Sequence, residues 1–392
     1  MDQSSTFTYT FYAEEVVFGV GTLARLGEVT DRHGLRRVLV CTTPHSRGRG
    51  HLDRIEATLG DRLVAIYEGV RPHVPQSQVS EAVSLASQHT VDGVIGLGGG
   101  SSIGMAKATG LALEELRTGR PARAGYPTDQ PLVPVIAIPS TYSGSEMTPI
   151  YGVTYQTEEG EPPRKVTVTD AKVTPKVSLY DPVLTLDLPP ALTAGTGINA
   201  IAHCIEALYS ISRNPVSSSL ARSGLQVMAE ALPRCYRAGD DLAARTDMLM
   251  GSFLAGTALS NVAMGLHHGL CHVLGGATGV AHGDVNSVLL PHVIRFNLEA
   301  TAPALAEAAL AMGAVSAAAA REDPQEGGLA AAGRVIGWVR EMHLPERLRD
   351  LGVSEADLPQ LANLAMANRT IQNNPRPIRD SAEIEALLRA AW

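Results

Sequence analysis

Residues 93–104 read Gly93-Val-Ile-Gly-Leu-Gly-Gly-Gly-Ser-Ser-Ile-Gly104, an apolar run that passes into consecutive glycines. The run up to Leu97 has the composition of a buried strand, and apolar residues recur at helical spacing from Ser102 to Leu113. Glycines between a strand and a helix let backbone N–H groups approach a phosphate, and the helix N-terminus favours an anion there. The turn is not a G-x-G-x-x-G fingerprint, so a purely steric role for its glycines is the alternative.

Strands and helices alternate around this turn through the first half of the chain. Short apolar runs predict strands at 37–41, 63–67, 93–97, 133–138 and 177–180, and helical periodicity covers 51–59, 76–89 and 102–113. Two further runs, 152–155 and 165–169, are separated by a polar loop and predict a β-hairpin. Strands that are almost entirely apolar are typical of a parallel sheet covered on both faces.

The second half of the chain has a different composition. Beyond Leu188, the residues Ala, Leu, Met and Glu dominate at helical spacing, and Pro189 and Pro190 suit the start of a helix. A chain of 392 residues is also long for one hydrophobic core. We therefore predict an α/β dinucleotide-binding domain with a parallel, Rossmann-like sheet over 1–185 and an all-helical domain over 186–392.

Composition excludes several classes of function. The net charge is −8 and no basic run is present, which argues against nucleic acid as a partner. The most apolar stretch, 302–320, is interrupted by Pro303 and Glu307 and predicts a soluble helix pair, with no membrane partner. No signal peptide is recognisable, and the four cysteines form no C-x-x-C pair, so we expect reduced thiols in the cytoplasm.

A second turn follows another predicted strand and reads Pro139-Ser-Thr-Tyr-Ser-Gly-Ser145. Open parallel sheets bind ligands at the carboxyl ends of their strands, so these hydroxyls are candidates for nucleotide contacts. A Ser/Thr-rich turn that caps a helix is the alternative. The first strand ends in Cys41-Thr-Thr-Pro44, without the carboxylate that often binds the adenosine ribose, so we expect NADPH to be accepted as well as NADH.

Histidines are concentrated in two short windows of the helical half. Residues 265–283 contain four of the twelve histidines of the chain. His268 and His272 are four residues apart, as are Asn199 and His203, so each pair shares one helix face with a rise of about 6 Å. Single histidines on apolar faces are usually hydrogen-bonded core residues. Spacing alone leaves open whether this group binds a metal or moves protons.

Together these motifs resemble the iron-containing alcohol dehydrogenase family over essentially the whole chain. The resemblance implies a two-domain enzyme with a nucleotide domain, a helical domain and an active site in the cleft between them. The matching segments are Phe18-Gly-Val-Gly21, Gly98-Gly-Gly-Ser101 with Ala106-Lys107, Ile138-Pro-Ser-Thr-Tyr-Ser-Gly-Ser-Glu146, Tyr180-Asp-Pro182, the Asn199/His203 helix and the segment from His268 through His272 to His282-Gly283.

Two departures from the wider family point to one of its branches. Gly104 and Asn199 stand where the wider family has aspartates, the second of which is its first metal ligand. Both are similar to the maleylacetate reductase branch, as are Tyr142-Ser-Gly-Ser-Glu-Met-Thr-Pro149, Leu266-His-His-Gly-Leu-Cys-His272 and Asn374-Pro-Arg-Pro377. That branch implies an oxidoreductase that uses NADH or NADPH to reduce the C=C bond of maleylacetate to 3-oxoadipate, late in the breakdown of hydroxylated or chlorinated aromatics.

The resemblance also implies roles for individual residues. In the family, the positions of His203, His268 and His282 bind metal, and His272 stands near the nicotinamide. Three imidazoles suffice for Zn²⁺, but the neutral amide of Asn199 removes one compensating charge, so we expect activity without tightly bound zinc or iron. The expected catalytic residues are His203, His268, His272, His282 and Asn199; the cofactor contacts are Thr42, Gly98, Gly99, Gly100, Ser101, Ser140, Thr141, Ser145 and Lys165; the substrate contacts are Tyr142 and Arg376.

The substrate carries two carboxylates, for which Arg376 is a candidate anchor, with a surface salt bridge as the alternative. Three other functions stay open: a metal-dependent alcohol or aldehyde dehydrogenase acting on C=O, a lyase like dehydroquinate synthase that binds NAD transiently, and a non-catalytic nucleotide-binding module. Net consumption of NAD(P)H separates a reductase from the lyase. We expect the chain to work as a homodimer.

Overall fold

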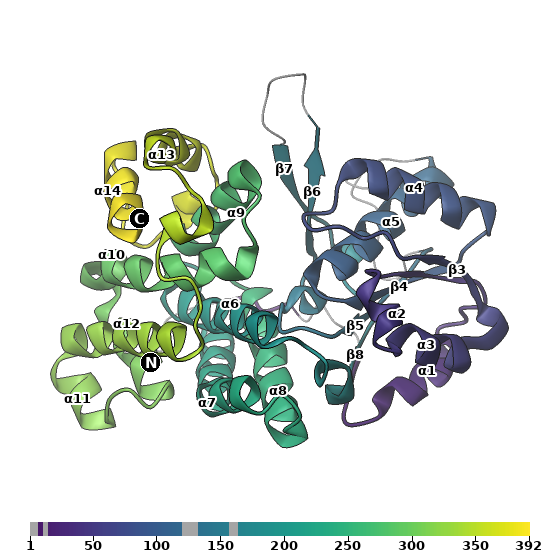
Figure 1. Ribbon diagram of the computed structural model, residues 1–392, viewed down its shortest axis with the longest axis horizontal. Coiled ribbons are helices and arrows are strands. Elements are labelled where there is room, and N and C mark those ends of the chain that lie inside the picture. The colour runs from purple at the N-terminus through teal and green to yellow at the C-terminus, as the bar shows by residue number, and fades with distance from the viewer. Residues whose placement is uncertain (1–6, 11–14, 120–131, 157–163) are drawn as a thin grey trace. The chain divides into compact units, whose positions relative to one another are not determined.

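The computed structural model describes residues 7–10, 15–119, 132–156 and 164–392 (Figure 1). These residues form two compact units. The sheet unit contains the described part of Tyr12–Pro189 together with Ala238–Leu249. The helical unit contains Pro190–Arg237 and Met250–Trp392, joined by residues 7–10.

Six parallel strands form the main sheet of the sheet unit, which confirms the predicted fold class (Figure 1). In order across the sheet they are β1 (Glu15–Phe18), β8 (Val177–Tyr180), β5 (Val135–Pro139), β4 (Gly93–Gly98), β2 (Val38–Cys41) and β3 (Leu63–Tyr67). The chain runs outward from β2 to β3 and then returns to place β4 on the other side of β2. Such a reversal is the position where open α/β sheets bind ligands, at the carboxyl ends of the strands.

Helices bury both faces of this sheet, which is why its strands are almost entirely apolar. Successive side chains of a strand point to opposite faces. On one face, Val38 and Val40 pack with α1 (Leu26–Arg32) and α3 (His51–Leu59). On the other face, Leu39 packs with α4 (Gln76–Gln88) and α5 (Gly100–Thr118). The helix α1 and the one-turn helix α2 (His45–Gly48) were not predicted, because segments this short carry little periodicity.

The helix α5 lies unusually close to β4. A Cβ atom on Gly96 would lie 2.9 Å from Cα of Ile103, so only glycine allows this approach. The helix begins at Gly100 and continues to Thr118, and is longer at both ends than predicted. Its N-terminus is thereby fixed at the end of β4, where the glycine turn lies.

A separate antiparallel hairpin is formed by β6 (Ile150–Tyr155) and β7 (Arg164–Thr169), as predicted (Figure 1). A hydrogen bond attaches the hairpin to the segment that precedes α4: Thr154 N donates to Val74 O at 3.0 Å.

The helical unit is all-α, as expected. Its first helix, α6 (Pro190–Tyr209), begins at the second of the two prolines. The others are α7 (Pro215–Arg237), α9 (Leu266–Thr278), α10 (His282–Ala311), α11 (Ala317–Glu322), α12 (Pro324–Glu341), α13 (Leu358–Met366) and α14 (Ser381–Ala391), while α8 (Leu242–Leu259) is divided between the two units. Among the described residues, no helix is sufficiently long and apolar to cross a membrane.

The predicted helix pair over 302–320 corresponds to the end of α10 and to α11. The backbone of α10 leaves helical geometry at Thr301, with φ −136° and ψ 16°, and Pro303 follows two residues later. Proline is tolerated in the first turn of a helix, so the break at Thr301 lets the helix restart with Pro303 near its beginning.

Two glycines bring α6 against the start of α10. A Cβ atom on Gly283 would lie 3.0 Å from Cα and C of Gly195, and one on Gly195 would lie 3.4 Å from Cα of Gly283. The two backbones are therefore in contact. This approach places His282, the first residue of α10, next to α6, which carries Asn199 and His203.

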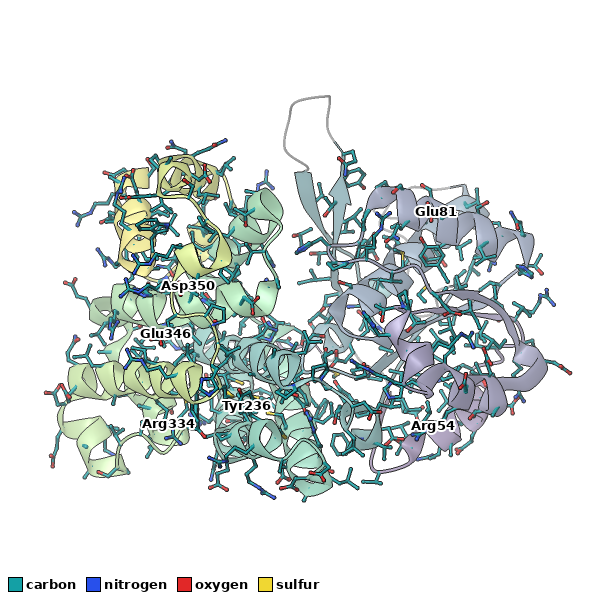
Figure 2. The ribbon with its side chains drawn as sticks, in the orientation of Figure 1. Arg54, Glu81, Tyr236, Arg334, Glu346 and Asp350 are labelled. Atoms are coloured by element: carbon teal, nitrogen blue, oxygen red, sulfur yellow. The ribbon has the colours of Figure 1, made fainter. Side chains whose placement is uncertain are left out.

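Charged side chains of both signs are interspersed on the outer faces of the helices. Figure 2 labels Arg54 and Glu81 on the sheet unit, and Arg334 and Glu346 on the helical unit, all of them exposed. Glu346 accepts from Arg340 at 2.9 Å, which illustrates how the acidic residues are paired locally.

Candidate active site

The glycine turn between β4 and α5 accommodates backbone but no side chains. Gly98 has φ +134°, a conformation that other residues rarely adopt, and a Cβ atom there would lie 2.8 Å from Ser102 Oγ. Gly99 has an ordinary φ of −85°, but its Cβ would lie 3.2 Å from Cγ2 and Oγ1 of Thr141. The first N–H groups of α5 have no acceptor within the helix. An anion at this position would meet those N–H groups and the positive end of the helix dipole.

The second turn, after β5, lies beside the glycine turn. Ser140 N donates to Gly98 O at 3.0 Å, which joins the two turns. Within the described residues, the buried Oγ1 of Thr141 has no hydrogen-bond partner. Leaving a buried hydroxyl unpaired costs about 1–3 kcal/mol, so a bound group is expected to supply the partner. The backbone cradle and this hydroxyl fit the phosphates of NAD(P)H, and Gly98, Gly99, Gly100, Ser101, Ser140 and Thr141 are brought together here.

Thr42 joins the ends of two neighbouring strands. Its side chain is fully buried, Oγ1 donates to Leu97 O at 2.9 Å, and Ser46 Oγ lies 2.6 Å away. These bonds place Thr42 at the switch point between β2 and β4. A direct contact of its side chain with the cofactor stays a prediction.

Lys165, a predicted cofactor contact, lies in β7 opposite Thr154, and its side chain is outside the described part of the chain.

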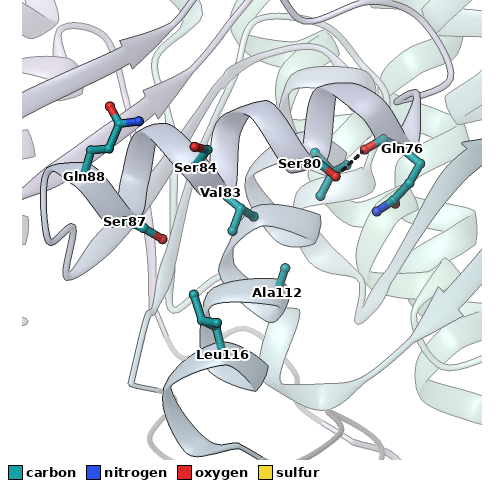
Figure 3. A pocket seen from close by; sticks show the side chains of 9 residues that line it. Gln76, Ser80, Val83, Ser84, Ser87, Gln88, Ala112 and Leu116 are labelled. Atoms are coloured by element: carbon teal, nitrogen blue, oxygen red, sulfur yellow. Dashed lines mark hydrogen bonds between the residues drawn. The ribbon is translucent and has the colours of Figure 1, made fainter.

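A shallow hollow of about 490 Å³ lies between α4 and the last turns of α5, lined by Val83, Ala112 and Leu116 among others (Figure 3). Ala112 is twelve residues beyond Gly100, about 18 Å along the helix, so this hollow is not the phosphate site.

Beneath the second turn lies a buried pair of charged residues that sequence analysis left without a role. Lys107 is fully buried on α5, and its Nζ donates to the carbonyl oxygens of Ser145 (2.6 Å), Thr148 (2.7 Å) and Ile150 (3.0 Å). Burial lowers the pKa of Lys107 to about 7 and raises the pKa of Glu146 to about 6. Lys107 thus holds the second turn to the helix that begins at the first, which places Ser145.

The imidazole cluster lies in the helical unit, where three helices converge. The ring centroids of His203 on α6 and His268 on α9 are 4.6 Å apart and stacked. His282 at the start of α10 stacks on His272 at 5.7 Å, and its ring lies 6.1 Å from that of His268. His203 and His268 are each only 4% exposed, whereas His272 and His282 are half-buried. The predicted catalytic histidines therefore form one contiguous group.

Unpaired polar atoms are concentrated in this group. Among the described residues, Oδ1 of Asn199, Nδ1 of His203 and Nε2 of His268 are buried without a hydrogen-bond partner. Burial, reinforced by the neighbouring histidines, holds the pKa of His203 well below its ordinary value. A cluster with this many unsatisfied groups is suited to a polar ligand that supplies the missing partners.

The carboxylate of Glu206 binds His268, a member of the imidazole cluster, and the backbone next to it. Glu206 is fully buried on α6, and Oε1 accepts from the backbone N–H groups of Gly265 (3.1 Å) and His267 (3.2 Å). Oε2 accepts from the backbone N–H of His268 at 3.3 Å and from Nδ1 of the same residue. Burial alone would raise the pKa of Glu206, but His268 and these hydrogen bonds hold it below its ordinary value. The only sequence signal for this residue was a carboxylate inside an otherwise apolar helix.

His267 is a structural residue. It is fully buried, and its Nε2 lies 2.6 Å from Oδ1 of Asn286, whose Nδ2 donates to the carbonyl oxygen of His282 at 2.6 Å. An amide oxygen only accepts, so Nε2 of His267 carries the proton. Burial, with a contribution from His268, lowers the pKa of His267 to about 4. This residue behaves as the hydrogen-bonded core histidine that a single helix position suggests.

The arrangement of these side chains does not fit a closed metal site. Across the part of the chain that the structure describes, no three His, Cys, Asp or Glu side chains are placed to hold one ion. The residue one turn before His203 on α6 is the neutral amide of Asn199, which supplies no charge to compensate a cation. Nδ1 of His268 is engaged by Glu206, which leaves Nε2 as the one ring nitrogen of His268 that is able to bind a ligand. We therefore derive no chemical step through a metal.

The two predicted substrate contacts are both engaged in structural interactions. Tyr142 is fully buried, and its hydroxyl accepts from Nη1 of Arg245 at 3.1 Å within the sheet unit. Arg376 lies 3.9 Å above the ring of Phe296, donates to the Phe296 carbonyl at 2.8 Å and pairs with Glu383 at 3.4 Å. These contacts correspond to the salt bridge that was the alternative for Arg376, and a substrate role for either residue stays a prediction.

Known proteins resemble this chain along its whole length. Residues 13–182 match the profile of iron-containing alcohol dehydrogenase, and residues 193–392 match that of the C-terminal part of the same family. The maleylacetate reductase of Pseudomonas knackmussii is 36% identical over 98% of this chain and 97% of its own. The crystal structure of maleylacetate reductase from Agrobacterium tumefaciens is 35% identical, covers 99% of this chain and 98% of its own, and superposes with a TM-score of 0.82.

A 1,3-propanediol oxidoreductase structure is 30% identical, covers 99% of this chain and 100% of its own, and superposes with a TM-score of 0.90. The family profiles and relatives of this identity over nearly the full length agree with the resemblance seen in the motifs. The chain therefore belongs to the iron-containing alcohol dehydrogenase family.

Proposed function

We propose that this protein uses NADH or NADPH to reduce the C=C bond of maleylacetate (4-oxohex-2-enedioate) to 3-oxoadipate, a late step in the breakdown of aromatic compounds. The observation that carries the proposal is Asn199, a neutral amide four residues before His203 on α6, where metal-dependent family members have a carboxylate. The chain is 36% identical to the maleylacetate reductase of Pseudomonas knackmussii and 35% identical to that of Agrobacterium tumefaciens over nearly its whole length, which supports the same substrate.

The imidazole cluster suits the charge that this reaction develops. Bound NAD(P)H supplies a hydride, which the alkene carbon β to the ketone accepts. Negative charge then builds on the ketone oxygen as an enolate, and a proton must reach the carbon next to the ketone. His203 and His268 are buried and stacked, which supports a role in stabilising this charge, because fixed donors are worth most in a buried site. His272 and His282 are half-buried, so they connect this site to solvent and serve proton delivery.

A substrate panel tests the assignment. Purified protein is mixed with maleylacetate, related unsaturated oxo-diacids and aldehydes, with NADH and with NADPH, and loss of reduced cofactor is followed by absorbance. Reduction of the oxo-diacids supports the proposal. Reduction of aldehydes alone favours the alternative of an alcohol or aldehyde dehydrogenase acting on C=O. The similarity to 1,3-propanediol oxidoreductase supports that alternative. Conversion without net cofactor consumption would point to a lyase.

Activity with NADPH is expected to fall within about tenfold of that with NADH, a difference of about 1.4 kcal/mol. Thr42 and Thr43 after β2 offer no carboxylate to repel a 2′-phosphate. Glu68, which directly follows the neighbouring strand β3, is paired with Arg47 at 2.8 Å. The measurement is kcat/KM for both cofactors with one substrate. An NADH preference of about three orders of magnitude contradicts this expectation.

Arg47→Ala provides a sharper form of the same test. It frees the carboxylates of Glu68 and Glu56, so kcat/KM with NADPH should fall more than that with NADH. Arg340→Ala, which breaks a similar surface pair with Glu346 in the helical unit, is the matched control and should leave the ratio unchanged.

Removal of metal is expected to leave the reductase active. The native protein should lose less than half of its turnover after treatment with a chelator, because Asn199 is a neutral amide and no three described His, Cys, Asp or Glu side chains are placed to hold one ion. Asn199→Asp adds a carboxylate beside His203 and should increase uptake of Zn²⁺ or Fe²⁺, measured by elemental analysis. If the native enzyme binds one metal ion per chain and stripping that ion abolishes reduction, then His203, His268 and His282 are ligands.

We also infer that the protein works in the cytoplasm as a homodimer. All four cysteines are free and buried, which supports a reducing compartment. The homodimer rests on the family resemblance, and its test is the mass of the purified protein in solution.

A further inference from the structure

Glu206 satisfies two different sets of donors with its two carboxylate oxygens. Oε1 accepts from the backbone N–H groups of Gly265 and His267 and from the hydroxyl of Tyr209 at 3.3 Å. The two backbone groups lie at the N-terminus of α9, where a negative charge stabilises a helix, and Tyr209 is the last residue of α6. Oε1 therefore accounts for the structural role of the residue. Oε2 accepts from the backbone N–H of His268 at 3.3 Å and is the oxygen that contacts the side chain of the same residue.

The bond to Oε2 determines where His268 carries its proton. Both oxygens of Glu206 accept from fixed donors, Oε1 from two backbone N–H groups and a hydroxyl and Oε2 from the backbone N–H of His268. Burial alone would raise the pKa of Glu206, but His268 and these hydrogen bonds hold it below its ordinary value, so the carboxylate is ionised and can only accept hydrogen bonds. The hydrogen shared with His268 therefore resides on Nδ1. The other ring nitrogen, Nε2, is buried without a partner among the described residues and belongs to the cluster shared with His203.

The backbones of α6 and α9 hold the Glu206 carboxylate in a fixed position next to His268. Glu206 follows His203 by three residues on α6, so both side chains project from the same face of one helix. Gly265, at the N-cap of α9, leaves room for the carboxylate, since a Cβ atom there would lie 3.3 Å from Oε1. Glu206 is thus held from α6 and from the backbone of α9, which also carries His268.

We propose that Glu206 is a positioning residue that keeps the proton of His268 on Nδ1 and thereby presents Nε2 to the substrate. The orientation of the ring follows from the same bond, because rotation about χ2 would lose the contact with Oε2. The catalytic consequence rests on the proposed function. The position of the proton does not, since it follows from the contacts of the helical unit alone.

Nitrogen NMR of the unmodified protein tests the position of the proton directly. The protein is labelled with ¹⁵N-histidine, and His268→Asn identifies the signals of His268 by their disappearance. Couplings to the ring protons then distinguish Nδ1 from Nε2. We expect the shift of a protonated nitrogen for Nδ1. A bare Nδ1 with the proton on Nε2 overturns the proposal, whether or not Glu206→Gln folds.

Glu206→Gln tests the consequence for turnover. The amide oxygen is expected to take the place of Oε1, where three donors point, rather than that of Oε2, where the backbone N–H of His268 is the fixed donor. The amide NH₂ then faces Nδ1 of His268 and moves its proton to Nε2. By analogy with other carboxylate–histidine pairs, kcat should fall by about 10²–10⁴ while the KM for NADH changes less than threefold. The ¹⁵N spectrum of the variant should show the exchanged proton. An unchanged tautomer, or a kcat within about fivefold of the native value, overturns the proposal.

Tyr209→Phe is the matched control. It removes a hydrogen bond to Oε1 of the same carboxylate without touching Oε2, so it reports the purely structural part of the network. We expect a small loss of thermal stability, an unchanged His268 tautomer and a kcat within about threefold of the native value. If the kcat of Tyr209→Phe falls as far as that of Glu206→Gln, Glu206 has a structural role only. Failure of maleylacetate reduction in the native protein contradicts the proposed function but leaves the NMR result to decide on Glu206.

Discussion

His268→Ala is expected to lower kcat for reduction of maleylacetate by about 10²–10⁴, or about 3–5 kcal/mol of transition-state stabilisation. The imidazole of His268 is 4% exposed, stacks on His203 at 4.6 Å and offers a buried Nε2 that is unpaired within the described chain. Charge developing on the ketone oxygen would lose this group in a largely buried site. The losses of kcat for His203→Ala and His272→Ala are expected to lie in the same range. The measurement is steady-state kinetics with saturating cofactor.

Stability must be separated from chemistry in this experiment. His268→Ala leaves the buried Glu206 without its side-chain partner, so some loss of stability accompanies the loss of turnover. His268→Asn keeps an N–H donor close to the position of Nδ1 and should show the same kcat loss in a better-folded protein. His292→Ala, a half-buried histidine on α10, is the control and should retain native kcat. A loss below about tenfold for His268→Asn would remove His268 from the chemistry.

Gly99→Val is expected to raise the dissociation constant of NADH by about 10–100-fold, the usual effect of 1–3 kcal/mol of overpacking. A Cβ atom at this position lies 3.2 Å from Cγ2 and Oγ1 of Thr141, and the valine methyl groups extend further into the space between the two turns. That space holds the cofactor phosphates if the glycine turn binds them. The measurement is a fluorescence titration of NADH with protein.

A matched glycine is available as the control for this substitution. Gly333 lies on α12, and a Cβ atom added there would meet no atom of another segment within 4 Å, so Gly333→Val should leave NADH binding unchanged. Gly99→Val should also keep its thermal midpoint within a few degrees, because the added methyl groups meet only one turn. Unchanged NADH affinity in a folded Gly99→Val protein would assign the glycines a steric role in packing α5 against β4.

The sequence by itself determined the elements and their class. Runs such as Val38–Cys41 are apolar on both faces, and a strand of that kind is stable only when it is covered on both sides, so a parallel α/β sheet followed. The change of composition at Pro190 marked where helices replace strands. Spacing of four residues placed Asn199 with His203 and His268 with His272, because helix geometry is local. The glycine turn was recognisable for the same reason.

Only the tertiary structure decided which of these pairs meet and what each side chain does there. Strand order, and with it the switch point beside Thr42, depends on contacts between residues far apart in sequence, which periodicity does not encode. The approach of Gly195 to Gly283 brings His282 to α6, and no local pattern indicates that contact. Arg376 and Tyr142 had plausible positions in motifs, yet their partners Glu383 and Arg245 come from other segments. Glu206 acquires its role from the backbone of α9, 59 or more residues away, because a buried carboxylate is stable only where distant donors converge on it.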